Sequence, residues 1–201
     1  MVRDGKPKGF FYLDQRTVDS KHNIITDTTA GNVHDSIPYL GRLDPQRERF
    51  DLDAKAVGLD AGYASAPIAQ GLEERDVLGV TGYLRPSGRK GMIRKREFTF
   101  DPDANVYRCP EGQKTVSRHV WADARERTDA NRLTDWGKRL YARRKETVER
   151  SFADAKQLFG HRYARYRGLT GVKWQCLLAA TAQNIKKIAI MMDAKGKASP
   201  V

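Results

Sequence analysis

One glutamate in this chain stands among an unusual number of basic side chains. Glu149 lies in a segment whose apolar residues recur at helical spacing and form a stripe along one face. At about 100° per residue, Lys145, Glu149 and Lys156 align along one edge of this stripe. That stripe consists of Tyr141, Val148, Phe152, Ala155 and Phe159. A carboxylate flanked by cations at the border of a core is suited to hold a metal ion beside a phosphodiester. The alternative is an ordinary surface pair of Lys145 with Glu149, worth a few tenths of a kcal/mol.

A second carboxylate, Asp60, follows a short apolar segment that predicts a buried strand. The residues after it, Ala61-Gly62-Tyr63, predict a tight turn. Open α/β sheets bind ligands at the carboxyl ends of parallel strands, so Asp60 is placed to reach such a site. The alternative role is structural, because an Asp at this position commonly stabilises the turn that follows it.

Together, Asp60 and Glu149 predict a two-metal site for phosphodiester chemistry. Two Mg²⁺ ions about 4 Å apart favour the attacking oxygen and stabilise the leaving oxygen. Because Mg²⁺ prefers hard oxygen ligands, carboxylates are expected to hold it, and Mn²⁺ suits the same ligands.

The charge of the chain indicates a polyanionic partner, most simply DNA or RNA. Over 201 residues the formal net charge is +12, which is extreme for a metabolic enzyme. Between Lys138 and Arg167, ten basic residues stand against three acidic ones. Tyr163 and Tyr166 alternate with the last of these basic residues, which allows stacking on nucleotide bases as well as charge pairing with phosphates. The candidate DNA-binding residues are Arg143, Arg144, Lys145, Lys156, Arg162 and Arg165.

The composition also excludes several classes of protein. Two cysteines, Cys109 and Cys176, do not make a disulfide framework, and Cys176 is expected to be a small core residue of an apolar helix. No stretch approaches about 20 apolar residues, and the first residues do not form an apolar signal segment. We therefore expect no membrane partner and a soluble, cytoplasmic protein.

The spacing of apolar residues predicts a mixed α/β fold. The predicted strands cover residues 10–19, 23–28, 54–59, 77–83, 97–100 and 105–109. The predicted helices cover residues 36–43, 65–75, 121–133, 133–159 and 172–192. Asp35 or Ser36 is expected to cap the first helix. The strand, helix and strand over 54–83 predict a βαβ unit with parallel strands, and residues 85–92 predict a basic loop.

Several motifs in the same order resemble those of DDE transposases from bacterial insertion sequences. The segment YARRKETVERSFADAKQ, which begins at Tyr141, resembles their Y-R-E-K signature, and DAGY at Asp60 resembles their second-aspartate motif. GNVHDS at Gly31, together with RYRGL and TAQNIKK near the end of the chain, is also similar. The resemblance covers residues from about Lys6 to Met192.

This resemblance implies a ribonuclease H-like fold, in which helices flank a mixed five-stranded sheet and a segment is inserted before the last catalytic helix. It implies Asp60 as the second catalytic aspartate, Glu149 as the catalytic glutamate and Lys156 as a lysine near DNA ends. Exact signature spacing falls on Ala142 and Lys145, whereas Tyr141 and Arg144 come one residue early. Which basic residue contacts DNA therefore stays open. The resemblance also implies three partners: transposon ends, target DNA and a second copy of the chain.

The implied catalytic domain covers residues 6–192, with an insertion at about 85–132 and a disordered tail at 193–201. Only two strands are predicted before the first helix, so the family's first strand, with its catalytic aspartate, is expected to be missing at the N-terminus. The conceivable substitutes are Asp14, Asp19, Asp27 and Asp35, and of these Asp35 matches a family position, although not the first catalytic one.

Two further departures from the family concern binding. No helix-turn-helix module that would read transposon ends precedes the domain, and Cys109 with His119 alone makes a poor zinc site, which needs about four ligands. Three hypotheses follow. The chain is a transposase catalytic domain, an inactive remnant that binds DNA by charge, or a structural RNA-binding protein; the last leaves DAGY and the Glu149–Lys156 spacing unexplained.

Overall fold

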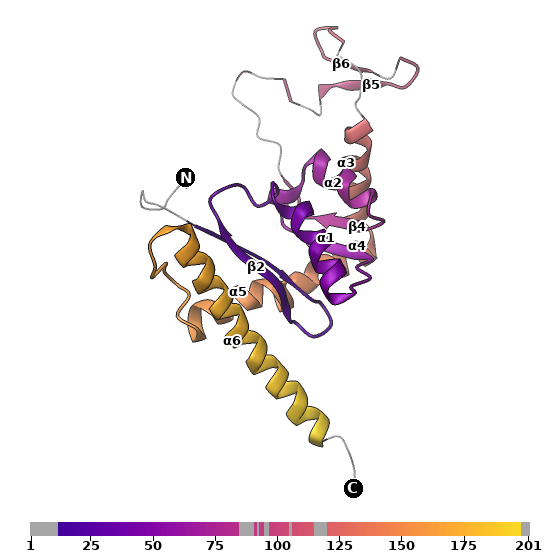
Figure 1. Cartoon of the computed structure of the whole chain (residues 1–201). Helices are drawn as coiled ribbons and strands as arrows, with labels where there is room; N and C mark the ends of the chain where they lie inside the picture. The colour runs from indigo at the N-terminus through magenta and orange to yellow at the C-terminus, as the bar shows by residue number, and fades with distance from the viewer. Residues whose placement is uncertain are drawn as a thin grey trace. The chain divides into compact units, whose positions relative to one another are not determined.

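The structure is a computed structural model of the chain (Figure 1). It describes residues 12–84, 91, 93–94, 97–104, 106–114 and 120–197. The chain divides into two compact units, of which the first comprises residues 1–54 and 142–201 and the second comprises residues 55–141. Each unit combines helices with short strands, which confirms the mixed α/β class.

The first unit is built on an antiparallel pair of strands, β1 (Leu13–Val18) and β2 (Ile25–Gly31). The turn between them is fixed by Asp19, whose carboxylate accepts the backbone N–H groups of Lys21 at 3.2 Å and His22 at 2.6 Å. Both strands were expected from the sequence, and the pairing adds the antiparallel direction.

The last helix of the chain, α6 (Gly168–Lys197), packs on β2 (Figure 1). The contact is made by small apolar side chains, because Ala30, Val172 and Cys176 form one buried cluster with exposed fractions of 2, 4 and 1 %. The helix was predicted to end at Met192 and continues to Lys197.

Polar side chains of α6 add directed bonds to the strand pair. Asn184 accepts the N–H of Ile25 at 2.9 Å and donates to the carbonyl of the same residue at 2.8 Å. Lys187 donates to the carbonyl of Asn23. The TAQNIKK segment, which the sequence marked only as similar to transposases, therefore ties α6 to β2.

The first helix begins later than the sequence predicted. α1 covers Tyr39–Phe50, and Pro38 occupies its N-cap position without a side-chain cap bond. The expected caps are engaged elsewhere: Asp35 accepts a hydrogen bond from Gln15 Nε2 at 3.1 Å, and the Ser36 hydroxyl bonds a histidine ring. The capping prediction is therefore wrong.

The segment predicted as one regular helix over 133–159 has three parts. α4 (Asp135–Arg144) is followed by a π-helical turn (Lys145–Glu149) and by α5 (Arg150–Leu158). A π turn is wider than an α turn and absorbs an extra residue. The constant angle of about 100° per residue therefore does not hold from one side of the turn to the other.

The second unit contains the predicted βαβ arrangement. β3 (Ala56–Leu59) and β4 (Leu78–Thr81) are parallel, and α2 (Ala66–Glu73) connects them. Its core is apolar, with Val80 and Leu72 exposed by 0 and 1 %.

A further helix of this unit, α3 (Val120–Asn131), packs on α2 and β4. Its Arg127 makes two hydrogen bonds of 2.7 Å to the carboxylate of Glu73, and Asn131 donates to the carbonyl of Gly79 at 3.2 Å. The predicted hairpin is also present, as β5 (Thr99–Asp101) and β6 (Val106–Arg108).

In the part of the chain that the structure describes, the strands pair as three two-stranded sheets. The single five-stranded sheet of a ribonuclease H-like fold therefore stays a prediction. The expected basic loop falls largely on residues 85–90 and 92, which lie outside the described residues, as does the start of the first predicted strand. None of the described helices has the length and apolar character needed to cross a membrane.

Candidate metal and nucleic-acid site

Glu149 is the last residue of the π turn, and about half of its side chain is exposed. Its Oε1 lies 3.9 Å from Nη1 of Arg144, five residues earlier. In a regular α-helix, residues five apart point about 140° away from each other. The wider π turn brings Arg144 and Glu149 to one face. Lys156, also exposed, follows two turns later along α5.

The helix that carries Glu149 is held in place by a buried arginine of β1. The Arg16 side chain is fully buried, and its Nη1 donates to the carbonyl and hydroxyl oxygens of Ser151 at 3.2 and 2.8 Å. Its guanidinium carbon also lies 4.5 Å from the centre of the Phe152 ring. Because Ser151 and Phe152 follow Glu149 closely, Arg16 fixes the start of α5 against β1.

Asp60 lies directly after β3, at the surface of the second unit, and is exposed. Its Oδ1 accepts the N–H of Gly62 at 2.8 Å and so stabilises the 3-10 turn Ala61–Tyr63. This is the structural role that the sequence left open. It engages one carboxylate oxygen, and an exposed carboxylate retains room for a cation.

Tyr141, near the end of α4, lies beside the Asp60 turn within the second unit. A Cβ added at Gly82 would lie 2.6 Å from the Tyr141 hydroxyl and 2.9 Å from the backbone nitrogen of Ala61. Only glycine allows this approach. The N–H of Gly82 also donates to the carbonyl of Leu59 at 3.0 Å, so Tyr141 contacts the chain where β4 leaves the sheet.

Asp60 belongs to the second unit and Glu149 to the first. That they share a cation therefore stays a prediction. Both carboxylates are exposed and have oxygen atoms of the kind that Mg²⁺ or Mn²⁺ prefers, so each fits the expected ligand.

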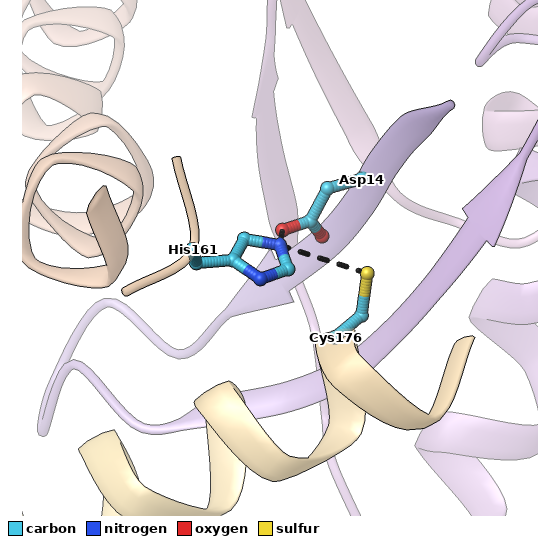
Figure 2. A group of neighbouring side chains, drawn as sticks. All are labelled: Asp14, His161 and Cys176. Atoms are coloured by element: carbon cyan, nitrogen blue, oxygen red, sulfur yellow. Dashed lines mark hydrogen bonds and ion pairs between the residues drawn. The ribbon is translucent and has the colours of Figure 1, made fainter. Parts of the chain in front are cut away.

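A different group of side chains converges inside the first unit (Figure 2). Asp14 of β1, His161 after α5 and Cys176 of α6 point toward one another, and their ligand atoms all lie within 4.8 Å. His161 Nε2 lies 2.9 Å from Asp14 Oδ2 and 3.7 Å from Cys176 Sγ. A carboxylate, an imidazole and a thiol are the ligand types of zinc sites.

Two contacts disfavour a metal at this cluster. The Asp14 carboxylate already pairs with the Arg16 guanidinium. The side-chain amide of Gln175 accepts the N–H of Arg165 at 2.9 Å and donates to the carbonyl of Tyr163 at 2.8 Å, so its NH₂ group faces His161 Nδ1 at 3.4 Å. Nδ1 is then the acceptor and Nε2 carries the proton, which it donates to Asp14. A metal would need the Nε2 lone pair. The cluster is therefore a hydrogen-bonded anchor.

The electrostatics of the cluster agree with a structural role. Burial alone would raise the pKa of Asp14, but the hydrogen bond from His161 and the charge and hydrogen bond of Arg16 outweigh it and lower that pKa below the ordinary 3.8. Burial and the Asp14 charge raise the pKa of the Cys176 thiol to about 12. Asp14 is thus held ionised and Cys176 is held as a neutral thiol.

The four aspartates considered as substitutes for the family's first catalytic aspartate all have protein partners. Asp14 is paired with Arg16, Asp19 caps the β-turn, Asp27 accepts from Arg42 Nε at 2.7 Å, and Asp35 accepts from Gln15. Of the candidate DNA-binding residues, Arg144 is half-buried and the others are exposed.

The structure and its charge define a mixed α/β protein with exposed carboxylates set among basic side chains. Residues 105–189, just under half of the chain, match the family model described as the transposase DDE domain. This match supports the resemblance to DDE transposases over that segment. Glu149 and Lys156 lie inside the matched segment and Asp60 lies before it. Comparisons with curated proteins and with solved structures gave no match.

Sequence reasoning missed the network of Asp14, His161 and Gln175. These residues are far apart along the chain, and none of them shows a local spacing that indicates contact with the others. It also missed the π turn. The signal for that turn was present, since Tyr141 and Arg144 stood one residue away from the signature spacing.

Proposed function

We propose that this chain is the catalytic part of an insertion-sequence transposase, which cuts DNA and joins the cut ends to a target. Asp60 and Glu149 would hold divalent cations, Mg²⁺ or Mn²⁺, which activate the attacking oxygen and stabilise the leaving oxygen when bound. The observation that carries the proposal is the exposed Glu149 carboxylate, set between Arg144 and Lys156 inside the segment that matches the transposase family.

The chain's own residues have two tasks in this reaction. Exposed basic side chains around Glu149 contact the phosphates and position the DNA. These contacts supply a binding affinity that falls as the salt concentration rises. Arg144 lies 3.9 Å from the Glu149 carboxylate, so the two opposite charges pair on one face of the π turn.

We further propose that the insertion at about 85–132 separates the two carboxylates along the sequence. DNA is the proposed partner, both transposon ends and target, and the active form would contain a second copy.

One assay tests the proposal. The full chain is incubated with end DNA of its own element and Mn²⁺ or Mg²⁺, beside Asp60→Asn and Glu149→Gln variants. Cleavage that is lost in both variants and kept in Glu146→Gln supports the proposal, because Glu146 is a second exposed glutamate of the same π turn. Cleavage that survives in Glu149→Gln would refute it.

A second candidate is an inactive remnant that binds DNA by charge. It is favoured by the state of Asp14, Asp19, Asp27 and Asp35, each of which has a protein partner. Salt-sensitive binding without cleavage by the unaltered chain would select this candidate.

A further inference from the structure

The segment between α5 and α6 exposes two tyrosines among three arginines. In this Arg-Tyr loop, residues 161–167, Tyr163 is 75 % exposed and Tyr166 is 54 % exposed. The arginines of the loop, Arg162, Arg165 and Arg167, are exposed as well. A single exposed aromatic side chain needs no explanation. Two exposed tyrosines that alternate with arginines have the composition of sites that stack on nucleotide bases and bind phosphates.

The backbone of the loop is fixed from inside the first unit. Gln175 of α6, itself 9 % exposed, donates to the carbonyl of Tyr163 at 2.8 Å and accepts the N–H of Arg165 at 2.9 Å. At the start of the loop, the N–H of His161 donates to the carbonyl of Ala155 at 3.0 Å. The His161 ring is in turn bound to the Asp14 carboxylate of β1, as Figure 2 shows.

Two glycines allow the loop to lie close to its supports. A Cβ added at Gly171 would lie 2.7 Å from Cβ of Tyr166, so Tyr166 sits directly on the first turns of α6. Gly160 has a φ of +62°, a conformation that favours glycine, and the Arg165 guanidinium lies over it. The loop therefore presents its tyrosines from a preformed backbone, which lowers the entropy cost of binding.

We propose that the Arg-Tyr loop binds unpaired bases of single-stranded DNA, with Tyr163 and Tyr166 stacking on the bases and the arginines contacting phosphates. In a duplex the base faces are covered by neighbouring base pairs, so exposed tyrosine rings gain contact area chiefly with a single strand. The inference rests on the proposed function only in taking DNA as the partner, since it needs neither metal nor catalysis.

The test measures binding of a fluorescent oligonucleotide by the full chain, as a single strand and as a duplex of the same sequence, without divalent cations. The double variant Tyr163→Ala/Tyr166→Ala is expected to weaken single-strand binding by about 30-fold or more and duplex binding by less than about 3-fold. Tyr163→Phe/Tyr166→Phe keeps the stacking faces and should bind like the unaltered chain. Thermal unfolding of both double variants checks that the fold is kept, because Tyr166 also rests against Gly171 of α6.

Two further variants separate stacking from charge and from loop position. Arg162→Ala/Arg165→Ala should weaken both forms of DNA and reduce the salt dependence of binding. Gln175→Leu removes both bonds to the loop backbone, so amide exchange at Arg165 should become faster and single-strand binding should weaken.

The outcomes distinguish this inference from the proposed function. If the tyrosine-to-alanine variant loses single-strand and duplex binding equally, or loses neither, the inference is wrong while DNA binding stands. Tighter binding of a single-stranded RNA of the same sequence would also overturn it. If the unaltered chain binds no DNA in either form, the inference and the proposed function both fail.

Discussion

Arg144 Nη1 and Glu149 Oε1 lie 3.9 Å apart across a single turn of π-helix. The pair accounts for the one-residue departure from the transposase signature. Exact spacing assigns the basic position to Lys145, four residues before the glutamate, whereas the arginine stands five residues before it. The π turn absorbs the extra residue and returns Arg144 to the face of Glu149.

The π turn makes a deletion tolerable at one place in this helical run. Removing Glu146 should convert the turn to regular α-helix, with Arg144 and Glu149 then four residues apart, and should change the free energy of unfolding by no more than about 1 kcal/mol. Urea denaturation of the two proteins measures the difference.

A deletion of Ala153 is the matched control, because it falls in the regular helix α5. It turns the buried Ala155 by about 100° away from its packing partners and should cost more than about 3 kcal/mol. Equal destabilisation by the two deletions would contradict the role given to the π turn.

Asp14 should contribute acid-sensitive stability. Its pKa is lowered in the folded protein, so its contribution is present above the ordinary value of 3.8 and is lost as the pH falls through the lower folded value. Asp14→Asn leaves Arg16 without its charged partner and should cost about 3 kcal/mol at pH 7. Below the folded pKa the difference between the two proteins should shrink.

Denaturation curves at a series of pH values check this prediction, with Glu48→Gln as the control. Glu48 is an exposed residue of α1 in the same unit, and its substitution should change stability by less than about 0.5 kcal/mol. A constant difference between Asp14→Asn and the unaltered chain at every pH would count against the lowered pKa.

Asn184 should contribute more to the free energy of unfolding than its neighbours on the outer face of α6. Asn184→Leu leaves the N–H and the carbonyl of Ile25 without their partner and should cost about 2 kcal/mol. Lys186→Ala, at an exposed position two residues later, should cost less than about 0.5 kcal/mol. Thermal unfolding would rank the two variants, and similar losses would mean that the bonds to β2 contribute little.

The two cysteines should differ sharply in reactivity. Cys176 is buried and the pKa of its thiol is raised to about 12, so it carries almost no thiolate at pH 8. Cys109 is half-buried on the loop after β6. A colorimetric thiol reagent should titrate one thiol in the native protein and two after unfolding in denaturant. A native Cys109→Ser protein that still reacts rapidly would show that Cys176 is accessible.

The elements with strong local patterns were predictable from sequence. The short apolar runs on either side of a helical segment predicted the parallel pair β3 and β4 around α2, and the spacing of apolar residues in the last segment predicted a helix there, α6. The large apolar side chains of α6, among them Trp174 and Ile185, are exposed, whereas the small residues Val172 and Cys176 are buried against β2. Periodicity thus predicted the helix but not the face that packs. Helix ends were less predictable, because Asp35 and Ser36 bond to other side chains instead of capping α1.

The candidate site was predictable only in part. The type and spacing of Glu149 and Lys156 indicated metal and phosphate chemistry, and the family match over residues 105–189 supports the resemblance to transposases. The anchor made by Asp14, His161 and Gln175 could not be predicted, because it depends on contacts between β1, the Arg-Tyr loop and α6. Periodicity describes one element at a time and does not report which polar side chains from different elements meet.

The most direct test of the central claim is where a paramagnetic ion binds the full chain. Mn²⁺ is titrated into the isotope-labelled protein, and the broadening of amide signals is followed for the unaltered chain, Asp60→Asn and Glu149→Gln. One cation held by both carboxylates predicts broadening at Ala61 and Gly62 together with Arg150, and loss of both effects in either variant. Broadening at one carboxylate that persists when the other is replaced would contradict a shared catalytic metal site.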